Sequence, residues 1–103
     1  DNFLNVQLDF TKTVVSKPSQ LFQNTPNPFK EKTTIGFQLA QTGPVKIEIF
    51  NLQGKQLKVI ENNFDKGYNE LSIHKNELNG NGVLWYRMQT LDGIYSRKMV
   101  LLR

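Results

Sequence analysis

Apolar residues alternate with polar ones along much of the chain, and this two-residue period is typical of half-buried β-strands. From residue 33, Ile35, Phe37 and Leu39 occupy every second position, so one face of this run is expected to be buried. A less regular alternation over residues 3 to 10 predicts another strand, which either closes a preceding domain or pairs with this one.

A hairpin over about residues 45 to 60 is the clearest local prediction. Its first strand alternates apolar and polar side chains, with Lys46 and Glu48 expected to face outward. Gly54 can adopt the positive φ that a tight turn requires, and the partner strand follows over residues 57 to 60.

The second half of the chain continues this alternation of strands and turns. Polar residues 61 to 67 predict a loop, followed by a strand over residues 68 to 73 and a tight corner at residues 79 to 82. Two β-rich runs, residues 83 to 89 and 95 to 102, flank an Asp-Gly pair that strongly favours a hairpin. Together these elements predict an all-β fold, an antiparallel immunoglobulin-like β-sandwich of about seven strands.

The stretch from Gln23 to Phe29, named here the proline segment, precedes these strands. Pro26 and Pro28 fix their own φ angles and push the residues before them toward extended geometry. We therefore expect a stiff, extended segment, with Phe29 as a large apolar anchor docked on the core of the following strands.

Composition narrows the possible functions. The 103 residues carry a net charge of +4 from 13 basic and 9 acidic residues, and they include no cysteine. The basic residues are scattered, which favours a mildly basic surface over a nucleic-acid-binding face. No run approaches the roughly 18 apolar residues of a membrane-spanning helix, so we expect none.

Candidate catalytic groups are few. His74 is the only histidine, and the carboxylates of Asp65, Glu70 and Glu77 show neither a calcium-loop spacing nor a paired acid–base arrangement. We therefore expect no enzymatic activity, no metal and no cofactor. Trp85, Tyr86 and Tyr95 leave open another class, an adhesion or carbohydrate-binding module with an exposed aromatic platform.

Several spaced motifs recur in a recognisable order along the chain. They are Pro26-Asn27-Pro28-Phe29, residues 33–37, residues 45–54, residues 67–69, and Gly82 to Met88 followed by Arg97 to Leu102. In this order they resemble the type A C-terminal sorting domain of the type IX (Por) secretion system. The resemblance covers roughly residues 21 to 103. Leu84 stands where that family usually has an aromatic residue.

The resemblance implies a function in export. A domain of this kind directs its parent protein from the periplasm of a Bacteroidota bacterium through the outer-membrane type IX translocon. Its partners would be the translocon, a shuttle protein, a surface sortase that removes the domain, and the upstream passenger of the same chain. The parent would end at the cell surface or be secreted.

The same resemblance assigns recognition to residues at three places. These are Pro26, Asn27, Pro28 and Phe29; Gly82, Tyr86 and Arg87; and Lys98, Met99, Val100, Leu101 and Leu102. Packing alone, or packing combined with recognition, would explain the last run. Arg97, Lys98 and Arg103 flank that run and are expected to keep both of its ends accessible to water.

Domain organisation follows from the same pattern. No leader sequence is recognisable near Asp1, so we expect the chain to be part of a longer protein. Residues 1 to 20 are expected to be the end of a preceding region and a linker, and residues 21 to 103 the sorting domain. Residues 11 to 20 are the expected place of sortase cleavage, because a protease needs unpaired backbone.

Overall fold

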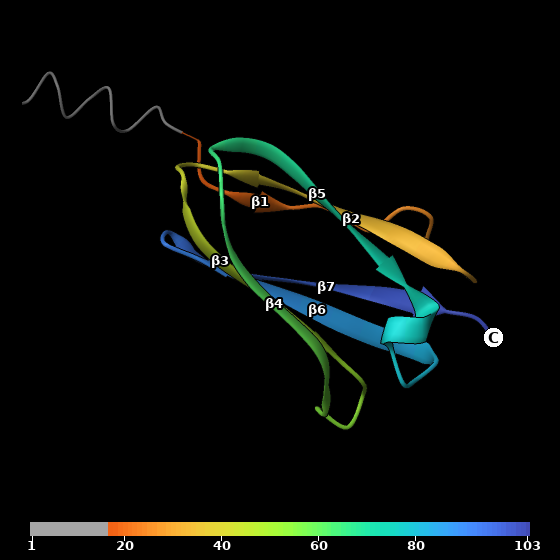
Figure 1. Ribbon diagram of the computed structural model, residues 1–103. Coiled ribbons are helices and arrows are strands. Elements are labelled where there is room, and N and C mark those ends of the chain that lie inside the picture. Colours follow the sequence, from red (N-terminus) through yellow and green to blue (C-terminus); the bar gives the residue numbers. More distant parts are fainter. Residues whose placement is uncertain (1–16) are drawn as a thin grey trace, which may run out of the picture.

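The computed structural model describes residues 17 to 103 as seven β-strands and one short 3₁₀ helix, arranged in two facing sheets (Figure 1). The strand expected over residues 3 to 10 and most of the expected linker lie outside this range. All strand pairings are antiparallel. The predicted all-β, immunoglobulin-like sandwich of about seven strands is confirmed.

The two sheets differ in size. The three-stranded sheet has the order β1-β2-β5, with β1 at Gln20–Leu21, β2 at Lys32–Leu39 and β5 at Gly67–His74. The four-stranded sheet has the order β4-β3-β6-β7, with β4 at Gln56–Phe64, β3 at Gly43–Phe50, β6 at Gly82–Thr90 and β7 at Gly93–Leu101. The helix η1, Lys75–Glu77, connects β5 to β6 and thus crosses between the sheets.

Both predicted hairpins are present. In the β3–β4 hairpin, Gly54 has a φ of 85°, which is the left-handed conformation expected of a glycine in this turn. In the β6–β7 hairpin, Thr90 pairs with Gly93 around the turn. Turn chemistry is local, so the sequence was sufficient to place these two hairpins.

The expected loop over residues 61 to 67 is wrong for most of its length. β4 continues to Phe64, paired with β3 as far as Gly43. The Phe64 ring meets the Phe37 ring of the opposite sheet edge-on, with 5.2 Å between centroids. This contact between sheets lengthens a strand whose residues 61 to 63 are polar and exposed, and only Asp65 and Lys66 remain as the turn.

Side chains from both sheets fill the space between them. On β6, Leu84, Tyr86 and Met88 all point inward, as the alternation predicted. The full set of buried apolar residues is Leu21, Phe29, Ile35, Phe37, Leu39, Val45, Ile47, Ile49, Ile73, Leu78, Leu84, Tyr86, Met88, Met99 and Leu101. One continuous core therefore spans the described sandwich, including residues that precede β2.

Glu48 departs from the expected solvent exposure. It lies on the outer face of β3 but is only 5% exposed, because Arg87 of β6 and Gln56 of β4 cover it. Arg87 donates to Glu48 Oε1 from Nη2 at 2.7 Å and from Nε at 3.1 Å. These hydrogen bonds hold the pKa of Glu48 below its usual value, although burial opposes them.

The Glu48–Arg87 pair predicts an acid-dependent loss of stability. Because the pKa of Glu48 is lowered in the folded state, its contribution is present above 4.5, the ordinary value, and is lost as the pH falls below it. We expect the free energy of unfolding to fall more steeply below pH 4.5 in the native protein than in Glu48→Gln, measured by urea denaturation at several pH values. Glu61→Gln, at an exposed site, is the matched control. Parallel curves for the native protein and Glu48→Gln contradict this account.

Candidate recognition site

The proline segment passes from one sheet to the other. Thr25 exchanges backbone hydrogen bonds with Thr34 of β2, at 2.9 and 2.8 Å. Residues 26 to 28 then bend, and the Thr25–Pro26 and Asn27–Pro28 peptide bonds are both cis. The expected stiff, extended rod is therefore wrong. The segment bends away from β2 and continues beside β7.

β6 pairs with one edge of β7, and the proline segment covers the other edge. The Phe29 N–H donates to the Val100 carbonyl at 3.0 Å, and the Leu102 N–H donates to the Phe29 carbonyl at 2.9 Å. The Val100 N–H donates to Asn27 Oδ1 at 2.9 Å. Two candidate motifs more than 70 residues apart in the sequence thus form one continuous site.

Side chains within this site divide between the core and the surface. Phe29 is 1% exposed and docks in the core as predicted, next to the buried side chains of Met99 and Leu101. Val100 is half-buried and Leu102 is 43% exposed. On the other side of the pairing, Pro26, Asn27 and Pro28 are exposed. The surface available to a partner therefore consists of the three residues of the bend and the outward positions of β7.

Two buried polar residues hold the bend, and sequence reasoning missed both. Asn24 Nδ2 donates to Thr33 Oγ1 at 2.9 Å and to the Pro26 carbonyl at 3.2 Å. The Thr33 hydroxyl donates to the same carbonyl at 2.9 Å. Asn24 and Thr33 are nearly inaccessible to solvent. In the sequence they resemble ordinary loop and strand-end residues, and no pattern distinguishes them.

Tyr86 and Gly82 contribute from β6. The Tyr86 ring is buried, and its hydroxyl donates to the Phe22 carbonyl, just before the proline segment, at 2.7 Å. Burial raises the pKa of Tyr86 to about 12. Gly82 has a φ of 81° and pairs with Leu101. Both residues position the site from within the fold and present little surface to a partner.

Arg87 and Lys98 lie on the outer face of the four-stranded sheet. Arg87 is bound to Glu48, and its guanidinium lies 5.2 Å from the centroid of the Phe50 ring. Lys98 is exposed, and its carbonyl accepts a hydrogen bond from the Gln23 side chain. The structure therefore brings Lys98 into the paired site but leaves Arg87 apart from it.

The two arginines expected to keep the ends of the last run accessible also have structural partners. Arg97 Nε donates to the Leu21 carbonyl of β1 at 2.9 Å, which joins the two sheets. Arg103 donates to the carbonyls of Gly80 at 3.0 Å and Leu78 at 2.9 Å. Guanidinium groups suit such positions because they offer several donors in a fixed plane. Both arginines remain exposed, as expected, and each also ties its end of the last run to the rest of the fold.

The aromatic platform that the carbohydrate-binding alternative requires is absent from the described residues. Tyr86 points into the core, whereas Trp85 lies on the outer face and stacks on Phe50, with 5.0 Å between ring centroids. The Tyr95 hydroxyl donates to Asp92 Oδ2 at 3.3 Å, beside the β6–β7 turn. Because the three rings do not share a face, the carbohydrate-binding alternative loses its main support.

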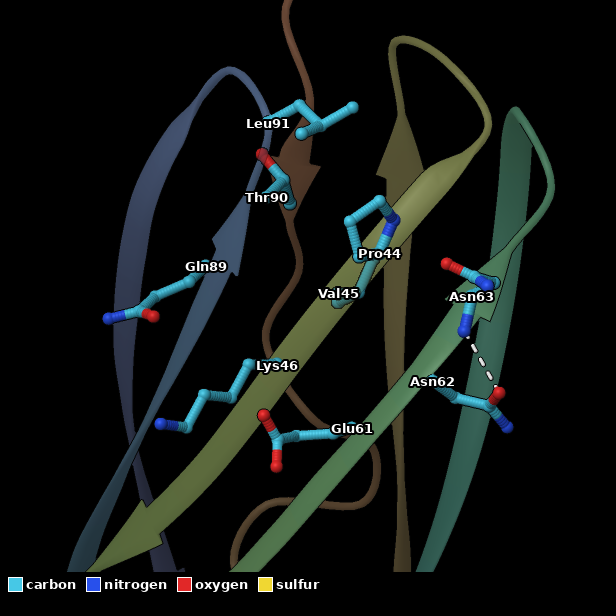
Figure 2. A pocket seen from close by; sticks show the side chains of 9 residues that line it. All are labelled: Pro44, Val45, Lys46, Glu61, Asn62, Asn63, Gln89, Thr90 and Leu91. Carbon is cyan, nitrogen blue, oxygen red and sulfur yellow. Dashed lines mark hydrogen bonds between the residues drawn. The ribbon is translucent and has the colours of Figure 1, made fainter.

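An open groove of about 580 Å³ crosses the outer face of β3, β4 and β6. Figure 2 shows Pro44 and Val45 in the middle of its lining, Lys46 and Glu61 below them, and Asn62 and Asn63 along β4. None of the candidate recognition residues lines it, and Glu61 is its only carboxylate. Within residues 17 to 103, no three histidine, aspartate or glutamate side chains gather in a way that could hold a metal ion.

A match to a known protein family covers the site formed by the proline segment and β7. Residues 25 to 102, which include both the proline segment from Thr25 onward and all of β7, match the family described as "Secretion system C-terminal sorting domain". The chain belongs to this family. The resemblance to type IX sorting domains found in the sequence is confirmed. None of the curated proteins searched matches the chain.

The fold of this sorting domain also occurs in a solved structure, that of dimeric latent PorU from Porphyromonas gingivalis. The TM-score is 0.64 at 18% sequence identity, with 84% of this chain and 10% of the PorU chain covered. This likeness shows a shared fold only. In residues 17 to 103 of the sorting domain, no helix has the length and apolar character needed to cross a membrane.

Phe29 should be a major source of stability in the sorting domain. Truncating a fully buried phenylalanine typically costs about 3 to 5 kcal/mol, because the transfer free energy is lost and a cavity remains. We expect Phe29→Ala to lower the free energy of unfolding by about this amount, measured by chemical denaturation. Phe22, 36% exposed, provides the control: Phe22→Ala should cost only about 1 kcal/mol. Equal losses in the two variants contradict the assigned role of Phe29.

Asn27 should protect the amide of Val100 from exchange with solvent. Removing a single hydrogen-bond acceptor costs about 0.5 to 1.5 kcal/mol, so we expect Asn27→Ala to speed exchange of the Val100 amide roughly fivefold. Asn27→Asp keeps an oxygen at Oδ1 and should leave the exchange slow. Amide exchange followed by NMR measures both, with the Leu102 amide, which is bound to the Phe29 carbonyl, as internal reference. Equal Val100 rates in the two variants rule out this contact as the source of protection.

Proposed function

We propose that this sorting domain directs an attached passenger protein through the outer-membrane type IX translocon. The observation that carries the proposal is that the family match coincides with one built site, in which the proline segment pairs with the outer edge of β7. The domain acts as an address for export and has no catalytic function. Its partners are the translocon and a shuttle protein, and the parent protein ends at the cell surface or in the medium.

The folded surface, and not a free strand edge, is the form that the machinery recognises. Addition of β7 to a partner's sheet would need unpaired backbone along its outer edge. From Lys98 to Leu102 that edge is already bonded to the proline segment. Recognition therefore uses the exposed side chains on both sides of the pairing, namely Pro26, Asn27, Pro28, Lys98 and Leu102.

Sortase removal of the domain takes place upstream of Ser19. Ser19 is buried: its N–H donates to Asp92 Oδ2 at 2.8 Å, and its hydroxyl accepts from the Ala40 N–H at 2.9 Å. Gln20 begins β1, where it pairs with Gln38. The sandwich therefore takes in two residues that the sequence assigned to the linker. This narrows the proposed cleavage stretch from residues 11–20 to residues 11–18, because paired and buried backbone resists proteolysis.

Export of a fusion protein tests this function. The whole chain is attached to the C-terminus of a periplasm-directed fluorescent protein in a host with a working type IX system. We expect fluorescence at the cell surface or in the medium, and periplasmic fluorescence when the chain is omitted. A fusion that folds and yet stays in the periplasm refutes the proposal.

Two double variants test whether export depends on the surface around the pairing. Lys98→Glu combined with Leu102→Ser changes two exposed side chains of this surface with little loss of core packing. We expect export to fall several-fold while the thermal midpoint of the purified chain stays within a few degrees of the native value. Lys66→Glu combined with Leu91→Ser, both at exposed positions outside the site, is the matched control and should export normally. Equal export by the two double variants places recognition elsewhere.

A further inference from the structure

The outer edge of β5 is unpaired within the described sandwich. β5 is the last strand of the three-stranded sheet, and only β2 pairs with it. Ser72 lies opposite Thr34, whose N–H and C=O both bond to Thr25 on the far side of β2. Alternate residues of an antiparallel strand turn both backbone groups to the same edge. The N–H and C=O groups of Tyr68, Glu70 and Ser72 therefore point away from β2.

The other strand edges at the margins of the two sheets are covered, short or guarded. The proline segment and β1 flank β7, and β1 itself has only two residues. On β4, Lys58 lies opposite the buried Ile49 and pairs with Glu77 at 3.8 Å, and a bulge interrupts the pairing with β3. Inward-facing charges and bulges discourage the addition of another strand. β5 has neither, because its eight residues contain no lysine or proline and pair with β2 without a register shift.

A hollow of about 340 Å³ lies beside this edge, on the outer face of the three-stranded sheet. We call it the Tyr68 hollow, and its lining includes Tyr68 and Glu70 of β5, Gly36 of β2, and Phe22. The Tyr68 ring lies across Gly36, where a Cβ atom would come within 3.0 Å of Tyr68 Cζ. The ring contacts Phe22, with 6.1 Å between centroids, and its hydroxyl donates to Glu70 Oε2 at 3.1 Å. These contacts hold two rings and a carboxylate together at the surface.

The chemistry of the Tyr68 hollow suits a cation. Glu70 is the one charged residue in its lining, and among residues 17 to 103 it forms no ion pair. Tyr68 is 58% exposed, Phe22 is 36% exposed, and aromatic faces attract ammonium and guanidinium groups. The two rings are tilted by 40°, so they form no flat platform for a sugar ring. A lysine or arginine side chain would meet both a carboxylate and aromatic rings in this hollow.

We propose that β5 accepts an extended basic segment of a partner protein as an added strand. The segment bonds to the outward backbone groups of β5, and its residue opposite Glu70 is a lysine or arginine whose side chain enters the Tyr68 hollow. The residues on either side of this one face inward and are apolar, because they lie beside the half-buried Leu71. The net charge of +4 on the chain opposes binding of a basic segment elsewhere.

Titration of the whole chain with a labelled peptide tests this binding. The probe is a blocked peptide that alternates valine and arginine and carries a fluorescent label, and fluorescence anisotropy is the readout. We expect saturable binding that weakens as the ionic strength rises, since Glu70 is exposed. The same peptide with glutamate in place of arginine should bind at least about tenfold more weakly.

Amide exchange followed by NMR shows whether the bound peptide forms a strand. At saturation the Glu70 and Ser72 amides should exchange at least about tenfold more slowly than in the free chain, because they gain hydrogen-bond partners. The Leu71 amide faces β2 and serves as the internal reference.

Variants of the chain separate the charge from the strand edge. Glu70→Gln keeps an acceptor for the Tyr68 hydroxyl but removes the charge, and it should weaken binding of the arginine peptide at least about tenfold. Glu61→Gln makes the same change at an exposed position of β4 and should have little effect. Ser72→Pro should abolish binding, because proline is tolerated at an edge position but cannot donate a hydrogen bond. Circular dichroism confirms that each variant is folded.

Four outcomes overturn the inference: no change in anisotropy up to about 1 mM peptide, equal binding of the glutamate peptide, equal binding by Glu70→Gln and Glu61→Gln, or binding without protection of the Glu70 and Ser72 amides. The outer edge of β5 and the Tyr68 hollow share no residue with the surface proposed for export, so the two assays fail independently. A fusion that is exported although the purified chain binds no arginine peptide refutes this site and leaves the export function in place. Binding without export does the reverse.

Discussion

The pairing of Phe29 with the outer edge of β7 is the interaction on which the rest of this domain depends. Two backbone hydrogen bonds and a buried ring fix the end of the proline segment, beyond its contact with β2 at Thr25. The same pairing covers a strand edge that would be open to adventitious association. It also joins the two sheets along one side of the sandwich, because Thr25 on the same segment is bonded to β2.

Burial and exposure alternate within the candidate site, and this alternation separates two kinds of residue. One kind supports the site from the core and consists of Phe29, Tyr86, Met99 and Leu101. The residues of the bend, together with Lys98 and Leu102, are those that a partner can contact. A motif that combines both kinds is difficult to interpret from mutagenesis alone, since loss of a buried member removes the surface along with the fold.

Sequence reasoning succeeded where the determinants are local. Alternation and turn residues predicted both hairpins, the inward face of β6 and the docking of Phe29. Sequence reasoning failed to predict the surroundings of residues whose neighbours come from distant parts of the chain. Glu48 is covered by an arginine from another strand, and Arg103 binds carbonyls near η1. The motifs of the candidate site were found separately, but nothing in the sequence showed that they form one surface.

The separation in sequence between the two halves of the site has a consequence for biosynthesis. Asn27 and Val100 lie 73 residues apart, so the contact closes a loop that includes nearly the whole sandwich. Contacts of such long range form late, after the local hairpins. A nascent chain, or one shortened before residue 100, has the proline segment but lacks the residues with which Asn27 and Phe29 pair. The surface proposed for recognition thus exists only on a finished domain. An export machine that binds this surface would reject incomplete polypeptides without a separate check.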